Sequence, residues 1–155
     1  MQSYGPTILR LCVGAVFFAH GTQKLLGVWG GPGVRGTISM LGHLGFKYVT
    51  LLGLLLILTE FVGSILLMAG AFARIASAAL AVEMGVAISK VHWRNGFFLN
   101  WTITPARGHG IEFDLVLMGA LLCLILVGPG ALSFDEGRSR SREVSAAGRA
   151  RIRKV

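Results

Sequence analysis

The stretch VTLLGLLLILTEFVGSILLMAG, residues 49–70, holds a single ionisable side chain, Glu60. An α-helix rises about 1.5 Å per residue, so a run of this length crosses a hydrocarbon core of about 30 Å. A second apolar run, FARIASAALAVEMGVAIS at residues 72–89, follows almost at once and carries Glu83 in its second half. The two runs predict consecutive membrane-spanning helices joined by a tight turn.

The composition of the whole chain agrees with membrane insertion. Hydrophobic residues make up 54% of the 155 residues and charged residues 14%, which leaves too little polar surface to cover a soluble globule of this size. Residues 7–27 and 111–131 have the same length and apolar character. The first of these is expected to be a retained helix rather than a signal peptide, because Arg10 lies inside its apolar region and no small-residue cleavage site follows. The sequence therefore predicts an all-α integral membrane four-helix bundle within residues 1–135, with spans at about residues 7–27, 49–70, 72–90 and 111–131.

Basic residues set the expected orientation, since Lys and Arg in short flanking segments stay on the cytoplasmic side. Arg74 lies in the tight turn between the second and third spans, and a cluster of basic residues follows the fourth. The two longer connections, residues 29–47 and 91–110, hold only four Lys or Arg residues: Arg35, Lys47, Arg94 and Arg107. Both termini are therefore expected in the cytoplasm.

The net charge of +8 belongs mainly to the C-terminal tail. Residues 138–155 contain seven basic residues and one acidic residue, which accounts for six of the eight net charges. Residues 136–155 are expected to form a disordered cytoplasmic tail that acts as an orientation signal, contacts anionic lipid or docks an acidic partner. Nucleic-acid binding is not expected, because the rest of the chain is apolar and carries little net charge.

Ionisable residues inside the spans are the first candidates for function, because an unpaired charge in a membrane interior is costly. Glu60 and Glu83 are equally far from the turn between their helices, so their carboxyls are expected at similar depth. In the first span, Arg10 and Lys24 fall on one helical stripe that is expected to face the bundle interior. His20 lies one turn before Lys24.

Two interpretations of these buried polar residues remain open. In one, the carboxyls of Glu60 and Glu83 form a proton-handling or quinone-ligand site, because two carboxylates in a low-dielectric interior cannot both ionise cheaply. In the other, each is half of a structural ion pair, for example Glu60 with Lys24 or Glu83 with Arg10. Arg10 and Lys24 also lie near the ends of their span, where they can act as anchors at the headgroups.

A second polar cluster is expected at the outer face of the membrane. His92 ends the third span, and His109, Glu112 and Asp114 open the fourth. Their spacing matches no familiar metal motif, so no metal site is predicted. Glu112 is instead expected to pair with a basic residue near the headgroups: Lys24, Lys90 or Arg94.

Glycines and cysteines give further expectations. The run WGGPGVRG, residues 29–36, predicts a flexible outer loop without a helix. Cys12 and Cys123 are expected to be small core residues, because neither belongs to a CxxC pair. Glycines inside the spans are expected where helices approach closely: Gly14, Gly21, Gly53, Gly63 and Gly119.

Several motifs taken together resemble the DoxX family. The first span carries LRL at residues 9–11 and AHGTQKLLG at residues 19–27, and the second carries EFVG at residues 60–63 followed by LLMAG. The AR turn at residues 73–74 and the ending GPGALSFD at residues 128–135 complete a resemblance that covers about residues 9–135. Glu83 departs from the family pattern. The positions that match it are His20, Lys24, Glu60, Arg74, Glu112 and Asp135.

The resemblance implies a multi-pass protein of the bacterial cytoplasmic membrane, related to the DoxD-type subunits of thiosulfate:quinone oxidoreductase. One implied function is an accessory, non-catalytic subunit that lies in the bilayer as part of a larger redox complex or a homo-oligomer. The alternative is a quinone-binding oxidoreductase component with its site near His20, Lys24 and Glu60. The accessory role is favoured, because the sequence shows no haem-ligand pair, CxxC motif, iron–sulfur spacing or dinucleotide fingerprint.

Overall fold

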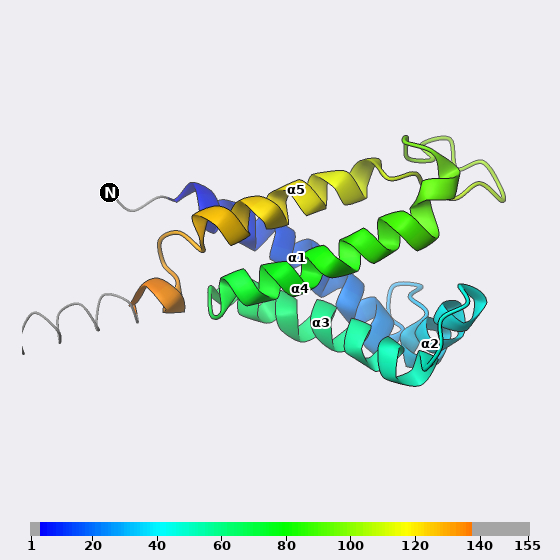
Figure 1. The fold of residues 1–155 in the computed structure, drawn as a ribbon, viewed down its shortest axis with the longest axis horizontal. Helices are drawn as coiled ribbons and strands as arrows, with labels where there is room; N and C mark the ends of the chain where they lie inside the picture. Colours follow the sequence, from blue (N-terminus) through cyan, green and yellow to red (C-terminus); the bar gives the residue numbers. More distant parts are fainter. Residues whose placement is uncertain (1–3, 138–155) are drawn as a thin grey trace, which may run out of the picture.

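The computed structural model describes residues 4–137, and this part of the chain is helical with no strand. The turn at residues 70–72 separates α3 (Val49–Ala69) from α4 (Ala73–Ala87). Helix α4 continues through a π-helical turn, η1 (Ile88–His92), and a short 3-10 turn, η2 (Trp93–Asn95). The basic tail from residue 138 onward lies outside the described residues, and residues 134–137 before it form a helical turn. The α-helices are α1 (Gly5–Leu26), α2 (Gly33–His43), α3 (Val49–Ala69), α4 (Ala73–Ala87) and α5 (Glu112–Val127) (Figure 1).

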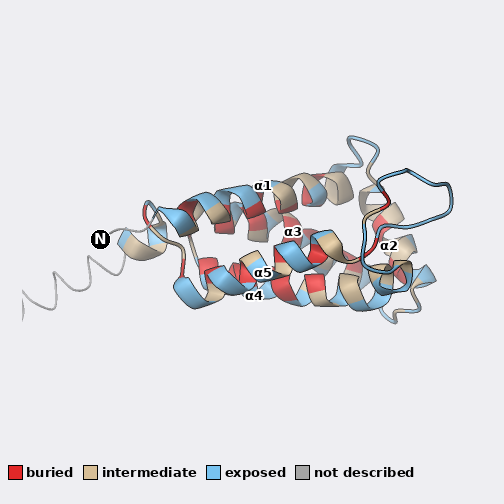
Figure 2. Cartoon of the chain, turned by 90° about the horizontal axis from the view of Figure 1, so that it is seen from above, coloured by how far each residue is buried: buried red, intermediate tan, exposed pale blue. Residues whose placement is uncertain are grey.

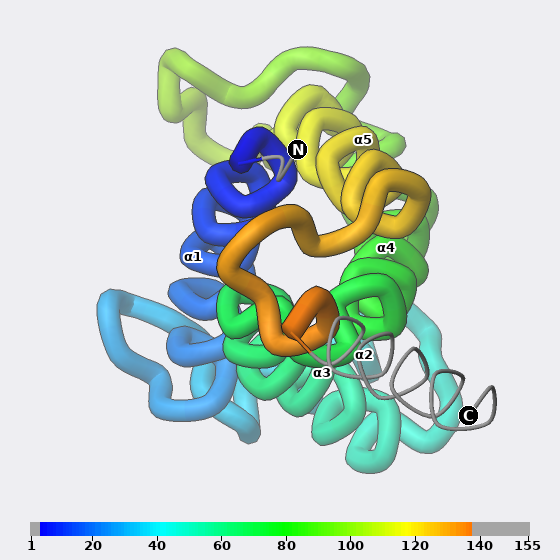
Figure 3. Tube along the Cα trace, turned by 90° about the vertical axis from the view of Figure 1, so that its left-hand side faces the viewer, coloured from blue at the N-terminus to red at the C-terminus, as the bar shows by residue number. Residues whose placement is uncertain are grey.

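The four longer helices pack in a ring, with α1 on α3, α3 on α4, α4 on α5, and α5 back on α1 (Figure 3). One end of the ring, the terminus end, holds the start of α1, the α3–α4 turn and residues 128–137 (Figure 1). The opposite end, the loop end, holds the short helix α2 and the loop of residues 96–111 (Figure 1). Helices α1 and α5 meet at the terminus end and lie further apart at the loop end, which leaves room between them there (Figure 1).

Apolar side chains lie on the outside of the bundle as well as in its core. Phe17, Leu67, Leu80 and Leu121 are almost fully buried between the helices. Aliphatic residues also lie exposed along the outward faces of all four long helices (Figure 2), among them Ile8, Leu51, Leu58, Val82, Val116 and Leu126. Within the described residues, two helices are long and apolar enough to cross a membrane by length and composition, Val49–Ala69 and Ala73–Asn95.

Three of the five span glycines allow close helix contacts, as predicted. A Cβ added at Gly21 would lie 2.7 Å from the backbone nitrogen of Phe61, so α1 and α3 touch backbone to backbone at this point. Gly14 likewise lies against Met68, and Gly53 against Ile38 of α2. The prediction was wrong for Gly119, around which a Cβ would meet nothing within 4 Å, and Gly63 has only ordinary contact with Leu80.

The structure corrects two expectations about local structure. The run at residues 29–36 is not entirely loop, because α2 begins at Gly33; Thr37 and Leu41 bury one face of this helix between α1 and α3, and that packing overrides the weak helix propensity of its glycines. Cys12 and Cys123 are exposed rather than in the core. Two residues advance a helix by about 200°, so Cys12 faces away from the buried side of α1 marked by Arg10.

Arg10 fixes the C-terminal segment at the terminus end. Its side chain is buried, and its guanidinium donates to the backbone carbonyls of Pro129 at 3.0 Å, Leu132 at 2.6 Å and Met68. The Asp135 carboxylate, on the same segment, accepts the backbone N–H groups of residues 72 and 73 at 3.0 and 2.9 Å and so caps the start of α4. The ion pair of Arg10 with Glu83 considered from the sequence is therefore not formed.

Candidate functional site

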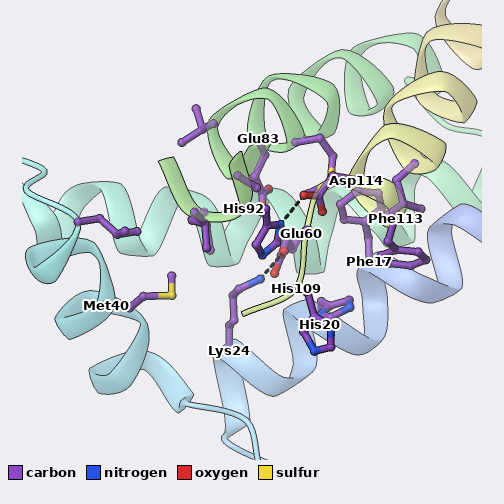
Figure 4. Close-up of a pocket in the computed structure, with 18 of the residues that line it drawn as sticks. Phe17, His20, Lys24, Met40, Glu60, Glu83, His92, His109, Phe113 and Asp114 are labelled. Atoms are coloured by element: carbon purple, nitrogen blue, oxygen red, sulfur yellow. Dashed lines mark hydrogen bonds and ion pairs between the residues drawn. The ribbon is translucent and has the colours of Figure 1, made fainter. Parts of the chain in front are cut away.

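A cavity of about 550 Å³ lies at the loop end of the described structure (Figure 4). Its walls come from α1, α3, α4 and α5, and it is covered by α2 and the loop of residues 96–111. Backbone hydrogen bonds between residues 96–98 and 110–112, such as Glu112 N–H to Phe97 O at 2.9 Å, close the neck of this loop. The apolar part of the lining includes Phe17, Met40, Leu41, Leu44, Phe46, Leu56, Met84, Phe113 and Leu117.

An ion pair between Lys24 of α1 and Glu60 of α3 lies on the cavity wall (Figure 4). The close contact of the two helices at Gly21 brings these side chains together, since Gly21 is one turn before Lys24. The Glu60 side chain is buried, and its Oε1 binds Lys24. The pair is the one considered from the sequence.

Glu83 of α4 lies next to Glu60 in the same cavity, and the two carboxyls interact electrostatically (Figure 4). Their equal distance from the α3–α4 turn places them at one depth, as the sequence predicts. The two side chains also share a hydrogen bond, which requires a proton on one of the carboxyls. Two carboxyls beside one ammonium group cannot both ionise cheaply in a low-dielectric interior, so the site holds one proton between them.

The predicted outer cluster opens onto this same cavity. His92 of η1 pairs through Nδ1 with Asp114 of α5, and both side chains line the cavity (Figure 4). His109 lines it from the covering loop, and its Nδ1 accepts the backbone N–H of Asn100 at 3.2 Å. His20 of α1 is a further lining residue. The two groups of polar residues that the sequence treats separately therefore form one site.

Two predicted site residues lie elsewhere. Arg10 is at the terminus end, where it binds backbone carbonyls. Glu112 is not paired with Lys24, Lys90 or Arg94; its Oε2 accepts the backbone N–H of Leu99 at 3.0 Å, which ties α5 to the covering loop. Both residues hold together the structure around the site, and neither lines the cavity.

Asn100 is a site residue that the sequence analysis missed. Its side chain is buried, and its amide donates to the carbonyls of Thr104 at 3.0 Å and Arg107 at 2.7 Å, while its Oδ1 accepts the N–H of Thr104. Asn side chains order turns by such local bonds. The stretch NWTIT at residues 100–104, in which Thr alternates with apolar residues after the Asn, was therefore a usable signal. The part of the chain that the structure describes contains no group of three or more His, Cys, Asp or Glu side chains suited to a metal ion.

Comparison with known protein families matches residues 5–93, more than half of the chain, to the DoxX family. The chain belongs to the DoxX family. It is 28% identical over 131 residues to the Bacillus subtilis (strain 168) protein named "Putative oxidoreductase CatD", and the match covers 84% of each chain. No solved structure matches.

The DoxX match runs from the start of α1 to the end of the helical segment that carries His92. It therefore includes the residues of three cavity walls, with Lys24, Glu60 and Glu83 among them. The covering loop and α5, which supply His109 and Asp114, lie beyond it. Membership of this membrane-associated family and the two apolar helices identify a membrane protein.

Proposed function

We propose that this DoxX protein is a membrane-embedded component of a redox system and that its cavity binds a ligand of the quinone class. The observation that carries the proposal is a pair of adjacent carboxyls, Glu60 and Glu83, beside the Lys24 ammonium on the wall of a mainly apolar cavity. Ionisable groups in a membrane interior are costly and mark functional sites, and a few polar groups in an apolar pocket are typical of ligand binding. These side chains can hydrogen-bond to the oxygen atoms of a bound ligand.

The cavity has the properties of a small-molecule site. Its volume of about 550 Å³ falls within the range of roughly 300–1,000 Å³ that is usual for such sites. The walls are mainly aliphatic and aromatic, with a few polar groups concentrated at Lys24, Glu60 and Glu83. This combination fits an aromatic ring with oxygen substituents, which is the head group of a quinone.

The proposed division of labour follows from the residues. A bound quinone supplies the capacity to take up and release electrons together with protons. Glu60 and Glu83 orient the oxygen substituents and hold or release a proton at their Oε2 atoms, while the Lys24 ammonium keeps the Glu60 carboxylate in place. The apolar walls exclude water from the ring.

An accessory role and a quinone site are compatible. The sequence has no haem-ligand pair, iron–sulfur spacing or dinucleotide fingerprint. In the proposed role, the protein is therefore a subunit beside a partner that exchanges electrons with the ligand. The relative named as an oxidoreductase supports a redox setting. A helix bundle that served only for packing would gain nothing from a second carboxyl beside the Lys24–Glu60 pair at a cavity, and this favours ligand binding over packing alone.

The proposed topology has α1, α3, α4 with η1, and α5 crossing the bacterial cytoplasmic membrane, and both termini in the cytoplasm. Exposed aliphatic side chains on all four helices, including Ile8 at 63% and Leu126 at 77%, support it, since water would disfavour so much apolar surface. The buried polar residues Arg10, Glu60 and Asp114 point away from those surfaces. Arg74 lies at the terminus end, and the basic tail follows residues 128–137 of the same end in the sequence. Both support the cytoplasmic assignment of this end.

Ligand binding is testable by extraction. The protein purified from membranes in mild detergent is expected to retain quinone, measured by solvent extraction and mass spectrometry. Leu117→Trp, which fills the cavity from α5, is expected to lose most of it, because Leu117 is a buried lining residue. Leu122→Trp is the matched control: Leu122 is 48% exposed on the same helix and should leave retention unchanged. Absence of quinone from wild type, or equal loss in both variants, contradicts the proposal.

Topology is testable by thiol labelling. In a background with Cys12 and Cys123 replaced by alanine, cysteines at Ser39 and Ile103 are expected to react with a membrane-impermeant maleimide in intact cells. Ile103 is 85% exposed at the loop end; Asn100, with 6% exposure, is unsuitable. A cysteine at Phe134, 73% exposed at the terminus end, should react only after permeabilisation. The opposite pattern would invert the topology.

A further inference from the structure

Side-chain exposure indicates where the cavity opens to the surface. Most of the lining residues are buried or half-buried, but some of them are exposed. The exposed ones are His20 of α1, Val86 of α4, Phe113 of α5, and Trp101 and His109 of the covering loop. A side chain that lies both on the cavity wall and at the surface marks the rim of an opening.

His20 and Phe113 lie on flanks of α1 and α5 at the same edge of the cavity. Gly21 of α1 touches α3, and His20, one residue earlier, is turned from it by about 100° around the helix. On α5, Asp114 faces η1 through its bond to His92. Phe113 is turned from Asp114 by the same angle of about 100°, to the edge away from η1. In Figure 4, Phe113 lies on the side of the cavity where His20 lies.

The α1–α5 side is the least tightly packed side of the helix ring. Contact between α1 and α5 is less extensive than contact between the other three neighbouring pairs. At the terminus end, the Thr7 hydroxyl donates to the carbonyl of Ala131 at 2.6 Å and joins α1 to the segment after α5. Towards the loop end the two helices diverge (Figure 1). His20 and Phe113 therefore bound an opening where α1 and α5 are furthest apart, and this opening is called the lateral portal.

The lateral portal faces lipid in the proposed topology, because α1 and α5 both cross the bilayer there. Val116, one turn after Phe113 on α5, is 66% exposed and continues the apolar surface beside the portal. A cavity of about 550 Å³ is the size used by a drug-sized molecule, so it holds a head group but cannot also enclose a long apolar chain. Such a chain has to leave through an opening, and it is more stable in lipid than in water.

From these observations, and resting on the proposed function, we propose that the ligand is a long-chain lipid quinone whose apolar chain passes through the lateral portal into the bilayer. The head group lies in the cavity beside Lys24, Glu60 and Glu83. Phe113 provides an apolar edge to the passage, and His20 lies where the head group joins the chain. The ligand enters sideways from the membrane and needs no path through water.

The other exposed lining residues mark less suitable exits. Val86 lies on α4, which packs on α3 more extensively than α1 packs on α5. Trp101 and His109 belong to the covering loop, which faces the aqueous phase in the proposed topology, where an apolar chain is unfavourable. The experiment therefore distinguishes three exits.

Photolabelling locates the chain. The full chain of the protein in lipid nanodiscs is given a methylnaphthoquinone that carries a decyl chain ending in a diazirine. It is irradiated with and without an excess of the same compound lacking the diazirine, and mass spectrometry of peptides identifies the labelled residues. Labelling that the competitor removes is expected on α1 and α5 beside the portal, near Val16 and Val116. It is not expected on α3, on α4 or on the loop of residues 96–111.

Matched substitutions test the portal itself. The decyl compound without the diazirine is compared with dimethylnaphthoquinone, which has a methyl group in place of the chain. His20→Trp fills the portal and is expected to weaken binding of the decyl compound at least about tenfold more than binding of dimethylnaphthoquinone. Dividing each variant's dissociation constant by that of wild type cancels the partition of each compound into lipid.

Three further variants serve as comparisons. His20→Ala removes the imidazole without adding bulk, so it should not weaken the decyl compound more than dimethylnaphthoquinone. Val86→Trp adds the same bulk at the rim on α4 and should likewise not distinguish the two compounds. Ala15→Trp is the control on α1, because Ala15 is exposed and does not line the cavity, and it should bind both compounds like wild type.

The outcomes separate this inference from the proposed function. Competable labelling near Val86 or on the covering loop, or no competable labelling by a bound probe, overturns the lateral portal and leaves a quinone-class site intact. Equal weakening of both compounds by His20→Trp overturns it as well, because His20 would then act on the head group. Failure of wild type to bind either compound overturns the proposed function too.

Discussion

Replacing Arg10 with alanine is expected to lower the free energy of unfolding by about 3–5 kcal/mol, the size of effect seen when one partner of a buried charged interaction is removed. The Arg10 side chain is buried, and its guanidinium binds carbonyls from both the end of α3 and the segment after α5. Alanine would leave these carbonyls without a donor in an apolar interior. For a chain of this size the loss corresponds to a melting temperature lower by on the order of 10 °C.

The measurement is a thermal melt in detergent, combined with limited proteolysis at residues 128–137. Arg10→Lys is expected to fall between alanine and wild type, because one ammonium group cannot reproduce the planar set of donors of guanidinium. Arg35→Ala, at an exposed position of α2, is the control and should melt like wild type. If Arg10→Ala melts like wild type and its C-terminal segment resists protease, the anchoring role of Arg10 is wrong.

The elements that the sequence predicted well are those decided by local physics. The apolar run at residues 49–70 became α3, Val49–Ala69, and the run at 72–90 became α4 and η1, because length and apolar composition suffice to define such helices. The equal depth of Glu60 and Glu83 followed from the helical rise alone.

The elements that were missed depend on contacts between distant segments. Helix α2 forms because Thr37 and Leu41 are buried against α1 and α3. No local pattern in this glycine-rich stretch indicates that packing. One of the open interpretations paired Arg10 with a carboxylate, but its partners are backbone carbonyls more than fifty residues away, and carbonyls are present at every residue. A charged residue in a span indicates that it has partners, but not which ones.

The candidate site shows the same limit. Glu60 with Lys24 was open to prediction, because helical spacing and charge leave few alternatives. The inclusion of His92, His109 and Asp114 in the same cavity was not, since it depends on how far α1 and α5 diverge and on how the loop of residues 96–111 folds over the gap. Sequence supplied the residues of the site, and the helix arrangement determined which of them meet.

Glu60→Ala is the second substitution with a large expected effect. It would leave the Lys24 ammonium without its counter-charge inside the protein and open further space at the cavity, with an expected loss of about 3–5 kcal/mol in the free energy of unfolding. Glu60→Gln keeps the shape and an acceptor for Lys24, so its cost should be smaller, about 1–2 kcal/mol. Thermal melts of both variants in the same detergent measure the difference.

A double substitution separates the contribution of the Lys24–Glu60 pair to stability from its contribution to ligand binding. Replacing a buried ion pair by apolar residues of similar volume is often neutral, so Lys24→Met combined with Glu60→Met should recover most of the stability lost in Glu60→Ala. If the pair serves only to hold α1 against α3, the double variant should also retain quinone like wild type. Because Lys24 and Glu60 supply polar groups to the wall of a mainly apolar cavity, we expect instead a stable protein that no longer retains the ligand. Full retention of quinone by this stable double variant would show that the ion pair is architectural and that the ligand is held by other groups.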